Sequence, residues 1–301
     1  MASSTLLSPL ATAVREVLSG RTDGQSDVAR AIGRPAGAAG WFAPGDAIWT
    51  VHGSVATFVG GIRSLYLQAL HPLAMAGIDR HSTYREDPFG RLQRTGAFIA
   101  ATTYGSADLA QQTVDAVRVM HRRVQGTAPD GRAYSAGDPR LLEWVHIALV
   151  DSMLSAYQCL GREGAVDPDA YVADMAVVGT RMGVADPPRS VGGLAERFAD
   201  FGPELRVDDV VHRTHRFVTE APLPLALRPG YRVLARAAWA TQPSWALEML
   251  DSAPRRRTLH VGAADAALRV LRVALVASPA RLAGERRLEA TGPDAGDGRL
   301  A

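Results

Sequence analysis

Three Asp-Pro pairs, each followed by a long stretch with apolar residues at helical spacing, constrain the fold of this 301-residue chain more than any other feature. They are Asp87-Pro88, Asp138-Pro139 and Asp167-Pro168. An aspartate side chain can accept hydrogen bonds from the free N–H groups at the start of a helix, and proline at the first helical position loses no hydrogen bond. Ser106 and Ser190 are further cap candidates, and Gly126 and Gly183 suit helix ends. Because no alternating strand pattern accompanies these signals, we predict an all-α, bundle-like fold.

The chain is long enough for one large helical domain. An apolar content of 47% is ordinary for a globular protein and can supply its core. Residues 20–45 are rich in Gly, Ala, Pro and Asp, so we predict an N-terminal arm over 1–45. The all-helical domain is predicted over 46–280, and a polar, Gly-rich flexible tail over 281–301.

Composition excludes several classes of function. All 33 basic residues are Arg, so Lys-based Schiff-base chemistry is impossible. The net charge of +2 gives no strong attraction to nucleic acid, and we predict no nucleic-acid partner. Cys159 is the only cysteine, which excludes an intrachain disulfide and a Cys-rich metal site. We see neither a secretory signal nor a transmembrane segment and predict a cytoplasmic protein.

Two helical segments carry histidines among apolar residues. Over 106–125, four apolar residues share one face with His121, which directs this side chain toward the interior. They are Ala110, Val114, Val117 and Val124. The segment 138–160 is apolar around most of its circumference, as a central buried helix would be, and it contains His146.

Two further segments contribute polar candidates. His71 stands before Pro72 in the middle of the apolar stretch 62–78, where the proline should kink the helix or restart it. Arg91 and Thr95 are four residues apart, so they share a helix face, with Arg94 adjacent.

These residue types suit a haem pocket. A buried neutral imidazole can bind iron, Arg can pair with the haem propionates, and a hydroxyl can hydrogen-bond bound oxygen. Each residue also has a structural interpretation. His121 and His146 can be core histidines, Arg91 and Arg94 a solvated or ion-paired face, and His71 a helix cap beside the proline. The residues alone do not separate these interpretations.

Other candidates are weaker. His212 and His215 are three apart on a helix that begins near Asp208, a spacing compatible with a metal. Two arginines, at 213 and 216, crowd the same turn and would repel a cation, so we interpret this pair as a solvated face. Gly60-Gly61 lacks the pattern of a phosphate-binding loop and indicates a turn or a close helix contact.

Four stretches in this order resemble the MpaB / rubber-oxygenase (latex-clearing protein) family. They are HPLAMAGIDRHSTYREDPFGRLQRTGAFI, TTYGS, MHRRVQG and GRAYSAGDPRLLEWVHIALVDSMLSAY. The resemblance covers residues 45–160 well and continues weakly to about 275. It implies an all-helical fold around one haem b, in a family whose members cleave carbon–carbon double bonds of isoprenoid chains with dioxygen. It also implies that His121 is the proximal iron ligand and that Arg91 and Thr95 line the haem pocket.

The chain departs from the latex-clearing enzymes at two positions. A Lys that can ligate the iron in those enzymes corresponds here to Arg94, whose guanidinium stays protonated and cannot donate to iron. The distal side should therefore be open, water-filled or ligated by another group. A Glu that serves as a base in those enzymes corresponds to an apolar stretch around Met75, with His71 four residues before it.

We therefore predict a haem b-dependent oxygenase that acts with dioxygen on an apolar, isoprenoid-like substrate. His121 is the predicted iron ligand, and Arg91, Thr95 and His71 are the predicted catalytic residues. The predicted cofactor-contacting residues are Arg91, Arg94, Thr95, His121 and His146. Two alternatives remain open at this point: a haem-binding carrier or sensor without turnover, and a cofactor-free helical scaffold that binds an apolar ligand.

Overall fold

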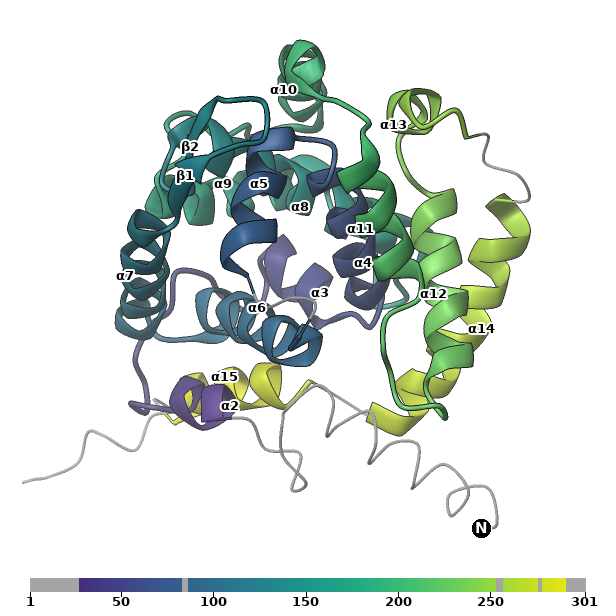
Figure 1. Ribbon diagram of the computed structural model, residues 1–301. Coiled ribbons are helices and arrows are strands. Elements are labelled where there is room, and N and C mark those ends of the chain that lie inside the picture. Colours follow the sequence, from purple (N-terminus) through teal and green to yellow (C-terminus); the bar gives the residue numbers. More distant parts are fainter. Residues whose placement is uncertain (1–26, 83–85, 253–256, 276–277, 291–301) are drawn as a thin grey trace, which may run out of the picture.

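The computed structural model describes residues 27–82, 86–252, 257–275 and 278–290, and over these residues the chain is predominantly helical (Figure 1). The predicted all-α class is confirmed. One two-stranded antiparallel sheet, β1 (Gln125–Thr127) with β2 (Ala133–Ser135), interrupts the helices. Strands of three residues are too short to show an alternating pattern, so this sheet was not predicted from the sequence.

The helices follow one another with short connections. The first half comprises α2 (Asp27–Ile32), α3 (Ala47–Gly53), α4 (Thr57–Gln68), α5 (Pro72–His81), α6 (Pro88–Tyr104), α7 (Ala107–Arg123) and α8 (Pro139–Leu160). The second half comprises α9 (Pro168–Met182), α10 (Val191–Phe201), the 3₁₀ turn η1 (Gly202–Glu204), α11 (Asp209–Thr219), α12 (Arg228–Ala240), α13 (Ser244–Met249), α14 (Arg257–Leu275) and α15 (Pro279–Glu289).

The predicted helix starts are confirmed. All five predicted caps accept a hydrogen bond from a backbone N–H in the first turn of their helix; they are Asp87, Ser106, Asp138, Asp167 and Ser190. Gly183 ends α9 in the left-handed conformation, with φ of 107°, as predicted. The prediction for Gly126 is wrong, because α7 already ends at Arg123 and Gly126 lies in β1. Pro72 restarts the chain as α5 after α4 has ended.

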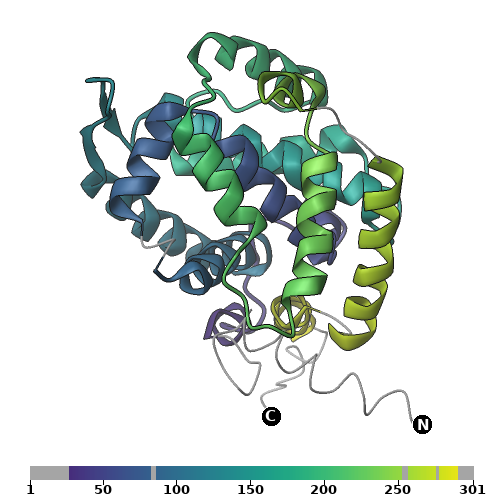
Figure 2. The same ribbon diagram turned by 45° about the vertical axis from the view of Figure 1, so that its right-hand side comes forward.

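The core is organised around α8, which packs against α4 and α9. Trp144, Ile147 and Val150 of α8 have no exposed surface, as expected of a central helix. Gly60 allows the close approach of α4, because a Cβ there would lie 2.8 Å from the Met153 Sδ atom. Helices α12 and α14 lie side by side on one flank of the molecule (Figures 1 and 2). Within the described residues, no helix combines the length and the apolar character needed to cross a bilayer.

The two ends of the described chain pack against each other. Helix α15 contacts α2 and α6. The side chain of Arg287 in α15 is 1% exposed and donates to the carbonyl oxygens of Ile32 and Ala38, both at 2.9 Å. It also donates to the Tyr104 carbonyl oxygen at 2.7 Å.

These contacts differ from the predicted arm and tail. The described part of the arm, 27–45, contains a helix and buried residues, and the described part of the tail, 281–290, is helical and packed. Local composition indicated loops there because the contacts that order these segments come from residues distant in sequence. Residues 1–26 and 291–301, also assigned to the arm and the tail, lie outside the described residues.

Candidate functional site

Helices α6 and α7 form an antiparallel hairpin that places Arg91 and His121 at the same end. The two helices pack along each other and are joined at Gly105 and Ser106. Arg91 lies about fifteen residues before this turn, and His121 lies about fifteen residues after it. At the helical rise of 1.5 Å per residue, each is roughly 22 Å from the turn. The two side chains, thirty positions apart in the chain, are therefore at the same level of the hairpin.

The C-terminal half of α5 and the small sheet meet at this end. A Cβ on Gly77 of α5 would lie 3.6 Å from the Tyr134 ring of β2 and 3.8 Å from Val124 at the end of α7. The hydroxyl of Tyr134 is 3.1 Å from the Nε2 atom of His81, the last residue of α5. Tyr134 is 5% exposed, so its buried ring fixes the position of the more exposed imidazole.

Helix α6 is tied to the same end by Arg91. Its half-buried guanidinium donates a hydrogen bond of 3.0 Å to the hydroxyl of Ser82, the residue that caps α5. We call this convergence the hairpin-end site. Its residues are His81, Ser82, Arg91, His121 and Tyr134.

His121 has the properties of a metal ligand. The side chain is half-buried, and its Nδ1 atom is buried without a hydrogen-bond partner within the described structure. Burial lowers the pKa of His121 below its ordinary value, so the neutral imidazole dominates at neutral pH. A neutral imidazole keeps a nitrogen lone pair that can bind a metal, whereas the imidazolium has none available.

Arg94 and Thr95 are placed differently from Arg91. The Arg94 side chain is 63% exposed and pairs with Asp87 at 3.4 Å, and Thr95 is exposed. From the sequence, Thr95 was predicted to line the haem pocket together with Arg91. Within the described residues, its side chain is instead left in contact with water. The roles of Arg94 and Thr95 stay predictions.

Exposed apolar side chains surround the hairpin end. Leu92 of α6 is 46% exposed and Met120 of α7 is 52% exposed, each next to a residue of the site. Contiguous apolar patches can mark binding surfaces, whereas single exposed apolar side chains are common on protein surfaces. The hairpin end thus combines an unpaired imidazole nitrogen, an arginine and apolar side chains.

His146 lies elsewhere, at the contact between α8 and α9. It is 8% exposed, its Nε2 atom lacks a hydrogen-bond partner among the described residues, and burial lowers its pKa to about 4. Its ring lies directly against Gly179 of α9. His146 is thus a second neutral imidazole, enclosed by protein, and its assignment as a cofactor contact stays a prediction.

His71 is the N-cap of α5, at the end of that helix opposite His81, roughly 15 Å away at the helical rise. It is fully buried, its Nδ1 atom accepts a hydrogen bond of 3.4 Å from the Ala74 N–H, and its Nε2 atom is 3.3 Å from a Glu204 carboxylate oxygen. Burial lowers the pKa of His71, and Glu204 partly opposes that effect. The structural interpretation, a helix cap beside Pro72, describes this geometry; a catalytic role stays a prediction.

The pair on α11 does not form a metal site. His215 is 7% exposed and its Nε2 atom contacts the Tyr66 carbonyl oxygen at 2.9 Å, whereas His212 is exposed. The interpretation as a solvated face is therefore wrong for His215, whose partner is distant in sequence. Among the described residues, no group of three or more His, Cys, Asp or Glu side chains could hold a metal ion. A haem iron needs no such group, because the porphyrin supplies most of its ligands.

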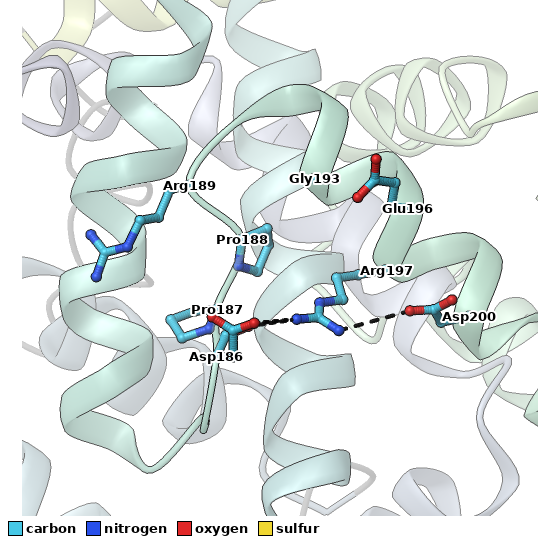
Figure 3. A pocket seen from close by; sticks show the side chains of 8 residues that line it. All are labelled: Asp186, Pro187, Pro188, Arg189, Gly193, Glu196, Arg197 and Asp200. Carbon is cyan, nitrogen blue, oxygen red and sulfur yellow. Dashed lines mark hydrogen bonds and ion pairs between the residues drawn. The ribbon is translucent and has the colours of Figure 1, made fainter.

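A pocket of about 380 Å³ opens between α10 and the segment before it (Figure 3). Its walls are Asp186, Pro187, Pro188, Arg189, Gly193, Glu196, Arg197 and Asp200. Arg197 pairs with Asp186 at 2.5 Å and with Glu143 at 3.2 Å, so its charge is already balanced. The pocket includes none of the sequence-predicted residues, and its charged walls suit neither haem nor an apolar substrate.

His81 and Tyr134 are not among the site residues predicted from the sequence. Both lie within the stretches that resemble the family, His81 next to Ser82, and their position in those stretches was the available signal. Their pairing depends on Gly126, since a Cβ there would lie 2.7 Å from the Tyr134 hydroxyl. A contact between helix α5 and a two-stranded sheet cannot be inferred from helical periodicity.

The fold and the comparisons together define the class of this protein. A family model described as "ER-bound oxygenase mpaB/B'/Rubber oxygenase, catalytic domain" matches residues 49–273. The all-α chain is thus an oxygenase-related protein. It belongs to the mpaB/rubber-oxygenase family, as its motifs predicted.

Two mycobacterial proteins are distant relatives of this chain. The uncharacterized protein Rv2237 of Mycobacterium tuberculosis is 27% identical over 203 residues, which cover 59% of this chain and 79% of the relative. The uncharacterized protein Mb2261 of Mycobacterium bovis gives the same values. No solved structure matches the chain significantly.

Proposed function

We propose that this chain is a haem b-dependent oxygenase that acts with dioxygen on an apolar, isoprenoid-like small molecule. Membership of an oxygenase-related family supports the reaction class. The observation that carries the haem assignment is the buried, unpartnered Nδ1 atom of His121 at the hairpin-end site. A histidine kept neutral by burial suits an axial iron ligand.

The other residues at the hairpin end fit the periphery of a haem. Arg91, which Ser82 orients, would pair with a propionate, and Arg94 is near enough on the same helix turn to assist. Leu92 and Met120 would cover apolar edges of the ring and lose their contact with water. When bound, the haem would supply the iron that activates dioxygen.

The proton-handling groups differ from those of the latex-clearing enzymes. Arg94 stands where a lysine can ligate the iron in those enzymes, and a guanidinium cannot replace it in that role. Tyr134 holds the imidazole of His81 in the hairpin-end site through Nε2, and an imidazole can serve as a general acid or base. Thr95, exposed on the same stretch of α6, can hydrogen-bond a ligand there. His71 remains a second candidate, farther along α5.

The first test is the absorbance spectrum of the purified protein, oxidised and dithionite-reduced, with a pyridine haemochrome assay. We expect a Soret band and about one haem b per chain. His121→Ala should abolish the band, whereas His212→Ala, which changes an exposed histidine, should retain it. His146→Ala and His71→Ala test whether one of these buried imidazoles binds the iron in place of His121.

Two outcomes would contradict the proposal. Full haem content in His121→Ala would mean that another residue binds the iron. A colourless wild-type protein that does not bind added haem would support the alternative of a cofactor-free scaffold.

A haem carrier or sensor without turnover is the second candidate. The exposed ion pair of Arg94 with Asp87, at the position of the absent lysine, favours it. Steady consumption of dioxygen in the presence of an isoprenoid alkene would exclude it. A haem-loaded protein that consumes no dioxygen with a panel of such alkenes would support it.

A further inference from the structure

The connection between α11 and α12, residues 220–227, lies at the edge of the ribbon (Figures 1 and 2). It exposes several apolar side chains. Leu225 is 76% exposed, more than any other large apolar side chain in the described part of the chain. Pro222, Pro224 and Ala226 are exposed beside it. Leu223 is 8% exposed and anchors this connection, which we call the 220–227 loop.

The backbone N–H group is absent or hydrogen-bonded at five of the eight positions of the 220–227 loop: Glu220, Pro222, Leu223, Pro224 and Leu227. Pro222 and Pro224 have no N–H group. The N–H of Leu223 donates to the Ala221 carbonyl at 2.7 Å, and that of Leu227 donates to the Pro224 carbonyl at 2.9 Å. Satisfied or missing donors lower the cost of moving a backbone segment out of water into an apolar environment.

Arginines flank the loop on both helices. Arg228, Arg232 and Arg236 are spaced four apart on α12, so their exposed side chains share one face. Arg213 and Arg216 are exposed on α11. The Arg228 side chain contacts the loop through a 2.8 Å hydrogen bond from Nε to the Leu223 carbonyl oxygen.

The charge on this surface is largely unbalanced. Within the described residues, the other four arginines take part in no ion pair. Glu220 is an acidic residue of the loop itself, at the end of α11, whereas Asp208 and Asp209 are at the far end of that helix. The surface around the loop therefore carries a net positive charge.

We propose that the 220–227 loop is a docking surface for an anionic lipid bilayer. The apolar tip around Leu225 enters the interface between headgroups and acyl chains, and the flanking guanidinium groups pair with lipid phosphates. Arginine suits this arrangement because its apolar stem can lie along the acyl region while its planar head binds phosphate. The proposal stands independently of haem, although a bilayer surface is also where an apolar substrate concentrates.

The test is co-sedimentation of the full-length protein with vesicles. One set contains phosphatidylglycerol and phosphatidylcholine in equal amounts, and the other contains phosphatidylcholine alone. We expect binding to the anionic set, weakening as salt is raised because the Debye length shortens. Leu225→Gln should lower the bound fraction at least fivefold. Leu259→Gln, which changes a 59% exposed leucine on α14, is the matched control and should bind as wild type.

A second pair of variants tests the contribution of arginine charge to vesicle binding. Arg232→Gln/Arg236→Gln should weaken binding at least fivefold, because both side chains lie on the proposed surface. Arg122→Gln/Arg123→Gln removes the same charge from an exposed part of α7 and should have a small effect. Circular dichroism and thermal unfolding of each variant verify that the fold is retained.

Three outcomes would overturn the proposal. One is wild-type protein that binds neither set of vesicles. Another is undiminished binding by folded Leu225→Gln. The third is a dimer that Leu225→Gln converts to a monomer without any vesicle binding, which would assign the loop to contact with a second copy of the chain.

Discussion

Gly179 of α9 and His146 of α8 are in direct contact, because the imidazole occupies the space that a side chain at position 179 would fill. A Cβ on Gly179 would lie 2.8 Å from Cε1 and 2.9 Å from Nε2 of His146. Both helices are well packed at this point, and Gly179 itself is buried. The glycine is thus required by a specific ring on the neighbouring helix.

Gly179→Ala should destabilise the protein. The added methyl group forces either the imidazole or α9 to move, which costs about 1–3 kcal/mol. Gly61→Ala is the matched control, since a Cβ there meets no atom within 4 Å in the described structure. That change should be neutral or stabilise α4 by about 0.5–1 kcal/mol. Urea denaturation measures both, and equal effects would contradict the assigned contact.

Acid should destabilise the fold partly through His146, whose pKa burial lowers from 6.5 to about 4. Above about pH 6.5 the imidazole is neutral in both states, and its full contribution to stability is present. Between pH 6.5 and 4, His146 is protonated in the unfolded chain but stays mostly neutral in the folded chain, so the unfolding free energy falls. By pH 4.5 the loss from this residue is roughly 2–3 kcal/mol.

His146→Phe keeps a ring beside Gly179 and removes the titration. Its unfolding free energy should therefore fall less than that of the wild type between pH 7 and pH 4.5. Both proteins keep some acid sensitivity, because burial also lowers the pKa of His52 to about 3 and that of His215 to about 4. Parallel stability profiles for the two proteins would show that His146 is protonated in the folded state as readily as in the unfolded chain.

Arg91 should contribute more to haem affinity than Arg94. Arg91 is half-buried and oriented by Ser82, whereas the Arg94 side chain is 63% exposed and paired with Asp87. Replacing Arg91 with Met should weaken haem binding by about tenfold, the scale of one charge-assisted pair. Arg94→Met on the same helix should weaken it by no more than about threefold. Titration of the haem-free protein with haem, followed by absorbance, measures both, and a larger effect of Arg94→Met would reverse the assignment.

Local sequence signals predicted the helices well and the chain ends poorly. Asp138 and Gly183 mark the limits of helices because caps depend on contacts within one turn. The order in the segments that contain α2 and α15 depends instead on Arg287, whose hydrogen-bond partners include Ile32, more than two hundred residues earlier. No local pattern contains that information.

In the candidate site too, local signals predicted features within one helix but not contacts between distant segments. Helical periodicity placed His121 on the apolar face of its helix, and the structure makes it half-buried with an unpartnered Nδ1 atom. Periodicity could not identify His81, because its contact with Tyr134 joins a helix to a strand. It also gave no sign that Thr95 would be exposed, since exposure depends on which helices cover α6.

By itself, the sequence determined the all-α class and the starts of several helices, because these follow from spacing and capping along a continuous chain. Its motifs also determined the family. Only the tertiary structure decided which side chains meet. It brought Arg91 and His121 to one end of a hairpin, and it buried Arg63 of the apolar helix α4 against Asp151 at 2.5 Å. Such contacts depend on how helices pack across the core, and residues far apart in sequence become neighbours only when the chain has folded.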